Sequence, residues 1–144
     1  MQPVPSVVLE IESRMEYASA AESAAFGFAS ALGLIGDDAR DYSLSVRELA
    51  INGIKHGNKL NPERRVRIEF YDTRDIIRTC VEDEGEQRFD PENYFTATGE
   101  NALSNHGRGL IFVESYTPGW RYDWLAPGNR FTVEKPIPDR EGIF

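Results

Sequence analysis

The feature of the sequence that most limits the fold is a helical segment with a narrow polar stripe. Segment 37–56 opens with two aspartates, whose carboxylates suit a helix N-terminus, and a Gly-Asn pair follows its last residue. Glu48, Asn52 and His56 recur in it four residues apart and fall within a sector of roughly 80° on a helix. Apolar residues flank this sector on both sides. The pattern predicts a mostly buried helix whose polar groove faces something other than bulk water.

The stripe also fits a plainer interpretation, an exposed polar face that ends in a capping histidine. Periodicity alone leaves both interpretations open. The elements around this helix are predicted from apolar alternation for strands and from 3.6-residue spacing for helices. Their order is a strand at 7–12, a helix at 16–32 ended by Gly33, the striped helix, a hairpin of strands at 65–71 and 76–83, a polar loop at 85–105, a helix within 106–116, and strands at 119–125 and 129–135.

This order predicts an α+β fold, a two-layer α/β sandwich in which a mixed, mostly antiparallel sheet has helices on one face. The other face stays open and is a candidate dimer surface. The chain has 144 residues, 40% of them hydrophobic, which fits one domain over residues 1–144.

Charge and composition narrow the range of partners and compartments. The net charge of −8 disfavours direct binding to nucleic acid and favours a basic protein partner. No apolar run has membrane-spanning length, and the N-terminal residues lack a secretory signal, so we expect a cytoplasmic protein. The single cysteine, Cys80, lies in an apolar-alternating run and is expected to be a plain buried residue.

Two glycine motifs are further signals of a ligand-binding site. Asp83 and Gly85 follow a predicted strand in the run VEDEGE, and Gly107 and Gly109 open a predicted helix in the run NHGRGL. Glycines let the backbone approach a ligand, and the N–H groups at a helix start favour phosphate oxygens. A lone Gly-x-Gly is a weak signal. The ordered set of striped helix, Asp-x-Gly, long loop and Gly-x-Gly is more specific.

That set resembles the nucleotide-binding fold shared by gyrase, heat-shock chaperone, histidine kinase and mismatch-repair ATPases. More narrowly, the chain is similar to the small anti-sigma-factor serine-protein kinases of bacteria, which control sigma factors by partner switching. The run RELAINGIKHGNK matches the first sequence box of that family, and DEGE with FDP and HGRGL match the second and third. The resemblance covers nearly the whole chain, and it implies a histidine-kinase-like ATPase fold that binds ATP and Mg²⁺.

Carried over residue by residue, the resemblance implies roles for the stripe. Asn52 would coordinate a Mg²⁺ ion that bridges the phosphates of ATP, and Glu48 would orient and deprotonate the attacking serine hydroxyl. Both roles suit the side chains, because Mg²⁺ takes oxygen ligands and a carboxylate one turn away can act as a general base. His56 matches a histidine of the first box and would have a structural or phosphate-facing role.

The resemblance also implies how the nucleotide is held. Asp83 would accept a hydrogen bond from the adenine amino group, and Gly85 would let the base approach. For Arg108, a solvated side chain without a ligand is the alternative. The phosphates would lie under a mobile lid, residues 85–105, against the helix start formed by Gly107, Arg108, Gly109 and Leu110.

The chain departs from the family pattern at two places. The family commonly reads Asp-Glu-Gly-x-Gly-Phe-Asp-Pro, whereas DEGEQRFDP has Gln87 and Arg88 in place of the second glycine and is one residue longer. This change either loosens the lid or supplies a phosphate contact from Arg88. Asn129 stands where the family has a threonine that supports the adenine site. Asparagine can still form hydrogen bonds there.

We therefore expect an ATP-dependent serine/threonine protein kinase that acts as an anti-sigma factor. It would phosphorylate an anti-anti-sigma protein, sequester a sigma factor and form a homodimer. The alternative is a non-catalytic nucleotide-binding regulator of the same fold that acts only by association. A detached ATPase module of a larger signalling protein is the third candidate, and the termini of the chain make it the least favoured.

Overall fold

The sheet has five strands in the order β1-β2-β3-β5-β4. In the computed structural model, which describes residues 3–90 and 108–138, all four strand pairings are antiparallel. The predicted α+β fold is confirmed, but the expected mixture of parallel and antiparallel strands is not found in the described residues. The strands are β1 (Val7–Glu12), β2 (Arg65–Asp72), β3 (Ile76–Glu82), β4 (Arg121–Trp124) and β5 (Asn129–Pro136).

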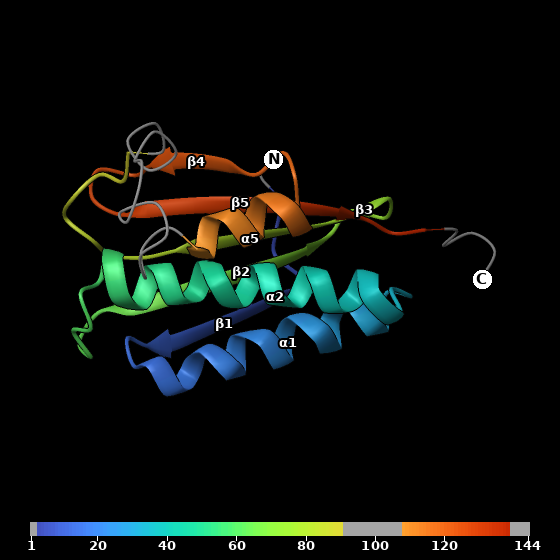
Figure 1. Cartoon of the computed structure of the whole chain (residues 1–144), viewed down its shortest axis with the longest axis horizontal. Coiled ribbons are helices and arrows are strands. Elements are labelled where there is room, and N and C mark those ends of the chain that lie inside the picture. Colours follow the sequence, from blue (N-terminus) through green and yellow to red (C-terminus); the bar gives the residue numbers. More distant parts are fainter. Residues whose placement is uncertain (1–2, 91–107, 139–144) are drawn as a thin grey trace.

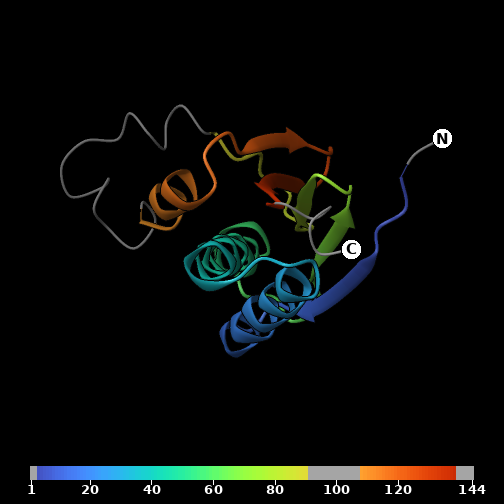
Figure 2. The ribbon, with the colours of Figure 1, turned by 90° about the vertical axis from the view of Figure 1, so that its right-hand side faces the viewer.

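In the part of the chain that the structure describes, three α-helices cover one face of this sheet and leave the other face open (Figures 1 and 2). They lie where helical periodicity predicts them, apart from small shifts at their ends. A 3-10 turn at Met15–Tyr17 precedes the first helix, and a π-helical turn at Gly53–Gly57 continues the second. The helices are α1 (Ala18–Ala31), α2 (Gly36–Asn52) and α5 (Arg108–Tyr116).

The core lies between the helices and the sheet. Small side chains let α1 approach closely, because Ala21, Ala25 and Ala29 recur every four residues and are fully buried. The hydroxyl of Tyr42 on α2 lies 2.5 Å from Oγ1 of Thr79 on β3 and anchors the helix layer to the sheet. α2 is thereby fixed over the strands, and its stripe points toward the end of the sheet where β3 finishes.

The open face of the sheet carries charged residues of alternating sign. One cross-strand row runs through Glu10, Arg67, Glu82, Arg130 and Asp123, one residue from each strand. Arg67 Nη1 lies 2.9 Å from Glu10 Oε1, and Arg130 Nε donates to Glu82 Oε1 at 2.7 Å. Opposite charges on neighbouring strands stabilise the sheet and keep this face polar.

Cys80 is a buried free cysteine, as predicted. Its sulfur lies 3.5 Å from Oγ1 of Thr132, and burial raises the pKa of the thiol. Within residues 3–90 and 108–138, no helix combines the length and the hydrophobicity that crossing a bilayer requires.

The end of the striped helix differs from the simple stop expected at residues 57–58. The chain stays helical to Gly57, but its last five residues form a π turn, in which Asn58 N donates to Gly53 O at 2.8 Å. A Cβ at Gly53 would lie only 3.1 Å from Cγ2 of Val66, so this turn packs directly on β2. π turns are frequent at functional sites.

Asn58 fixes this turn to three other parts of the chain. Its side chain is fully buried and donates to Ser13 Oγ at 2.9 Å and to Arg65 O at 3.0 Å. Its Oδ1 accepts a hydrogen bond of 2.8 Å from Glu84 N. The residue therefore holds the segment after β3 against the end of α2.

Candidate functional site

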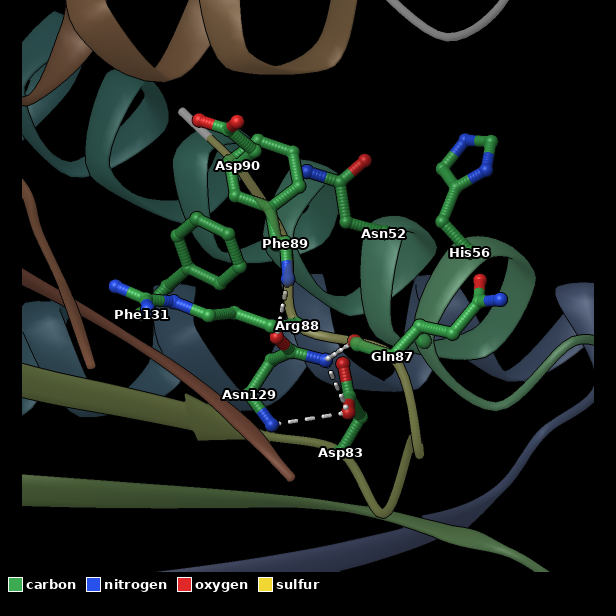
Figure 3. Close-up of a pocket in the computed structure, with 10 residues that line it drawn as sticks. Asn52, His56, Asp83, Gln87, Arg88, Phe89, Asp90, Asn129 and Phe131 are labelled. Atoms are coloured by element: carbon green, nitrogen blue, oxygen red, sulfur yellow. Dashed lines mark hydrogen bonds between the residues drawn. The ribbon is translucent and has the colours of Figure 1, made fainter. Parts of the chain in front are cut away.

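A cavity of about 390 Å³ lies where the π turn, the end of β3, the start of β5 and the segment 87–90 meet (Figure 3). Its volume is in the range of small-molecule sites. The stripe residues Asn52 and His56 face it, as does Asp83. The full lining is Asn52, His56, Gly57, Asp83, Gln87, Arg88, Phe89, Asp90, Asn129 and Phe131.

The carboxylate of Asp83 lies at the base of this cavity and is tightly held. Its Oδ1 accepts hydrogen bonds from Gly85 N at 2.8 Å and from the backbone N and side-chain Nδ2 of Asn129, both at 3.1 Å. Burial raises the pKa of Asp83, and these three bonds oppose the increase. Among the described residues no hydrogen bond reaches Oδ2, so this oxygen can accept a donor from a ligand.

Two glycines make room for this carboxylate. A Cβ at Gly57 would lie 1.9 Å from Asp83 Oδ2, and one at Gly85 would lie 2.5 Å from Gly57 O. The resemblance assigns Gly85 to the approach of a base. In the structure the close neighbour of Gly85 is the backbone of Gly57, so a side chain at position 85 would collide with that backbone. The sequence comparison did not assign Gly57 to the site.

Asn129 supports Asp83 from the opposite side. Its Nδ2 also donates to Gln87 O at 3.2 Å, and its Oδ1 accepts from Phe89 N at 3.0 Å. The asparagine that departs from the family pattern therefore binds both the carboxylate and the longer segment at residues 87–89.

Aromatic rings form one wall of the cavity, a feature that the sequence patterns did not reveal. Phe89 and Phe131 have ring centroids 5.3 Å apart, and Tyr122 packs against both, at 5.5 Å from Phe89 and 5.1 Å from Phe131. The rings are inclined to one another and give an apolar wall against which a planar heterocycle can pack. The alternation of Tyr122 and Phe131 in their strands was the available signal, but it did not identify this function.

Glu48 and Asn52, two residues of the stripe, lie close to Gly109 at the start of α5. A Cβ at Gly109 would lie 3.2 Å from Glu48 Oε2 and 3.5 Å from Asn52 Oδ1. Glu48 lies one helical turn from Asn52, outside the cavity lining. Burial raises the pKa of Glu48, Arg47 opposes the increase and Glu22 adds to it. A half-buried carboxylate and an amide oxygen thus face the N-terminus of a helix.

The remaining predicted residues at this helix start have different positions. Gly107 lies outside the described residues. Arg108 begins α5, and its side chain is also outside the description. Leu110 is fully buried in the hydrophobic core, so its side chain does not line the cavity.

The stripe is therefore neither a solvated face nor a wholly buried one. Glu48, Asn52 and His56 are all of intermediate exposure. A buried carboxylate, an aromatic wall and part of a polar helix stripe line one cavity, and a helix N-terminus lies beside it. This combination is typical of a nucleotide-binding α+β domain.

Comparison with known proteins agrees with this class. The chain belongs to the histidine kinase-like ATPase domain family, whose model matches residues 11–134. Membership supports nucleotide binding and an ATP-dependent activity of the kinase or ATPase type. The chain is also similar to the catalytic domain of histidine kinase ThkA in a nucleotide-free form, with 13% identity, 91% of this chain and 97% of that chain covered, and a TM-score of 0.48. No curated protein matches the chain significantly.

Proposed function

We propose that the chain is an ATP-dependent serine/threonine protein kinase and anti-sigma factor, which phosphorylates an anti-anti-sigma protein and sequesters a sigma factor. The observation that carries the proposal is the placement of Glu48 and Asn52 against Gly109, next to the cavity that contains Asp83. Phosphoryl transfer to a hydroxyl needs a base, a metal ligand and phosphate contacts, and this arrangement offers each of them. The matching sequence boxes support the narrower class.

The side chains present fit a Mg²⁺ ion held through Asn52. Within residues 3–90 and 108–138, no three His, Cys, Asp or Glu side chains cluster as a metal site. Mg²⁺ commonly takes one or two protein oxygens, the substrate phosphates and several waters, so the amide oxygen of Asn52 is sufficient. When bound, the ion supplies charge neutralisation on the phosphates.

In the proposed reaction the hydroxyl oxygen of a substrate serine or threonine bonds to the γ-phosphorus of ATP. The bond between that phosphorus and its bridging oxygen breaks, and ADP leaves. The hydroxyl proton passes to the carboxylate of Glu48. Because burial raises the pKa of Glu48, this carboxylate is a stronger base than an ordinary glutamate.

The partners in this proposal are proteins rather than nucleic acid or membrane. The net charge of −8 complements a sigma factor, whose DNA-binding surface is basic. A cytoplasmic location and a homodimer complete the proposal. The sheet face that the helices leave open supports the homodimer, because it offers a surface on which a second copy can pack (Figure 2).

The test is incubation with γ-labelled ATP, Mg²⁺ and the cognate anti-anti-sigma protein, with the transferred label measured over time. We expect label on a serine or threonine of that protein, and none with Glu48→Gln. Ser19→Ala, on the exposed start of α1, is the matched control and should transfer at the unchanged rate. Binding of ATP without transfer of labelled phosphate to that protein would refute the proposed kinase activity.

The second candidate is a nucleotide-binding regulator without catalysis. The observation that favours it is the longer segment at Gln87 and Arg88, which departs from the pattern of active kinases. It predicts that ATP changes the affinity for the sigma factor while no label is transferred. Pull-down of the sigma factor with and without ATP, run beside the transfer assay, separates the two functions.

A further inference from the structure

The side-chain amide of Asn129 uses its full hydrogen-bonding capacity. Nδ2 donates to Asp83 Oδ1 at 3.1 Å and to Gln87 O at 3.2 Å. Oδ1 accepts from Phe89 N at 3.0 Å and from the hydroxyl of Tyr122 at 2.5 Å. The carboxylate and carbonyl can only accept and the backbone N–H can only donate, so these partners fix which amide atom is oxygen.

These four bonds join parts of the chain that are far apart in sequence. Asp83 follows β3, and Gln87 and Phe89 belong to the cavity wall (Figure 3). Tyr122 lies on the edge strand β4. Asn129 itself is only 3% exposed. Because water cannot replace a lost partner in so buried a place, a shift of either the carboxylate or the wall leaves a polar group unsatisfied.

We propose that Asn129 is a positioning residue that couples recognition of the nucleobase at Asp83 to the placement of Gln87–Phe89 along the cavity wall. The inference rests on the proposed function in one respect, that the base of the nucleotide binds at Asp83. Three donors occupy Oδ1, two of them from Asn129, which leaves Oδ2 to accept from an exocyclic amino group. A base with a carbonyl oxygen at that position would place one hydrogen-bond acceptor against another, and no hydrogen bond could form.

The coupling has a direct consequence for selectivity. ATP and inosine triphosphate differ in the six-position of the base, which carries an amino group in ATP and a carbonyl in inosine triphosphate. Without the amide of Asn129, the carboxylate keeps the backbone donors of Gly85 and residue 129 but loses the bond that ties it to the wall. The carboxylate is then held by two bonds instead of three and by none to the wall, so it rotates or takes a proton more easily and the preference for the amino group declines.

The experiment is calorimetric titration of the full chain with ATP and with inosine triphosphate, both with Mg²⁺ at one pH and salt concentration. The variants are Asn129→Ala, Asn129→Thr and Asp83→Asn. Tyr122→Phe removes one partner of the amide, and Tyr71→Phe, whose hydroxyl contacts Glu69 on the open sheet face, is its matched control. Thermal unfolding of every variant is recorded beside the titrations.

We expect the unaltered chain to prefer ATP, and Asn129→Ala to reduce the ratio of the two affinities about tenfold, the loss of one bond to a charged group. Asn129→Thr keeps a short hydroxyl donor and should retain part of the ratio. Tyr122→Phe should reduce it more than Tyr71→Phe does. Asp83→Asn should reverse the preference, since an amide can donate to the carbonyl.

A second readout tests the coupling itself. Exchange of the Phe89 amide hydrogen, followed by NMR, should slow more with ATP than with inosine triphosphate in the unaltered chain. The two nucleotides should have equal effects in Asn129→Ala. A merely structural role predicts instead that both affinities and the melting temperature fall together while the ratio stays constant, and that result would overturn the inference.

The outcomes also separate this inference from the proposed function. Absence of binding to either nucleotide would refute the proposed function, and the inference with it. Binding of both with no preference, unchanged by Asp83→Asn, would leave nucleotide binding intact but overturn the role given to Asn129.

Discussion

Gly57 and Asp83 are packed so closely that a Cβ at position 57 would lie 1.9 Å from Asp83 Oδ2. Gly57→Ala must therefore push the carboxylate out of place and break its bonds to Gly85 and Asn129. We expect the affinity for ATP to fall by at least about tenfold, measured by calorimetry. Gly27→Ala on α1 is the control, because a Cβ there meets nothing within 4 Å. Equal affinities in the two variants would contradict this role of Gly57.

The pKa of Asp83 predicts a pH-dependent stability. Burial raises this pKa in the folded chain above the unfolded value of about 3.9, so protonation favours the folded state. The stability that this group contributes is full below the unfolded pKa and is lost as pH rises through the folded pKa. Asp83→Asn has no charge to bury, and its amide oxygen can still accept two of the three bonds.

The free energy of unfolding of Asp83→Asn should therefore exceed that of the unaltered chain at neutral pH and approach it in acid. Urea unfolding at a series of pH values measures the difference. A difference that does not change with pH would show that the Asp83 carboxylate does not carry the effect.

Asn58 is expected to be important for stability rather than chemistry. Asn58→Ala leaves Ser13 Oγ, Arg65 O and Glu84 N without this partner inside the protein, and the loss should be about 3 kcal/mol in the free energy of unfolding. Asn61→Ala is the control, because Asn61 is exposed and accepts one local bond from Glu63 N. Urea denaturation of the three proteins gives the comparison, and similar midpoints for Asn58→Ala and Asn61→Ala would contradict it.

The elements of the fold were predictable because their residues follow simple periods. Alternation placed β1, β2 and β3, and an alanine-rich run whose larger apolar residues have helical spacing placed α1, since packing of one face imposes a period on the sequence. The antiparallel pairing of all the described strands is not a local property, and for this reason the predicted mixture of parallel and antiparallel strands was wrong. The π turn at Gly53–Gly57 was missed for a similar reason, because it depends on contacts of two glycines with Val66 and Asp83.

Residues of the candidate site that belong to a sequence motif were predictable. Residues that act through hydrogen bonds to distant parts of the chain were not. The motifs placed Asn52, His56 and Asp83, which line one cavity. Asn58 looked like a helix stop, and Asn129 looked like a weakened substitute for threonine. Their importance comes from hydrogen bonds to residues 26 and 46 positions away in the chain, which no local pattern records.

Glu48 and Asn52 should separate catalysis from binding. Asn52→Ala is expected to lose the Mg²⁺-linked part of the ATP affinity, whereas Glu48→Gln should bind ATP nearly as well and transfer no phosphate. Calorimetry with and without Mg²⁺ and the label-transfer assay supply the two measurements. If both variants lose binding equally, the stripe is structural.

The pH dependence of transfer gives a further test of Glu48. Its raised pKa predicts that the rate falls, as pH decreases, at a higher pH than an ordinary glutamate would give. Glu22 contributes to the raised pKa and pairs with Arg47 at 3.5 Å. Glu22→Gln should therefore move the acidic limb of the rate profile to lower pH, and a limb that stays in place would argue against Glu48 as the base.

Arg88 is expected to contact the phosphates rather than to loosen the wall. The segment is anchored on both sides of it, because Gln87 O and Phe89 N are bonded to Asn129, while the Arg88 side chain lines the cavity. Replacing Gln87 and Arg88 with a single glycine removes one anchor and one charge, so ATP should bind more weakly. Arg88→Ala alone should reproduce most of that loss, whereas Gln87→Ala keeps the backbone carbonyl and should lose little.

Adenosine tests whether the charge of Arg88 acts on the phosphates. If it does, Arg88→Ala weakens ATP binding by several-fold, about 1 kcal/mol, and leaves adenosine binding unchanged, and the difference shrinks as salt is added. Titrations with both ligands at two salt concentrations measure this. Equal weakening of ATP and adenosine would place Arg88 in the wall of the base site instead, and tighter ATP binding after the glycine replacement would show that the longer segment holds the cavity open.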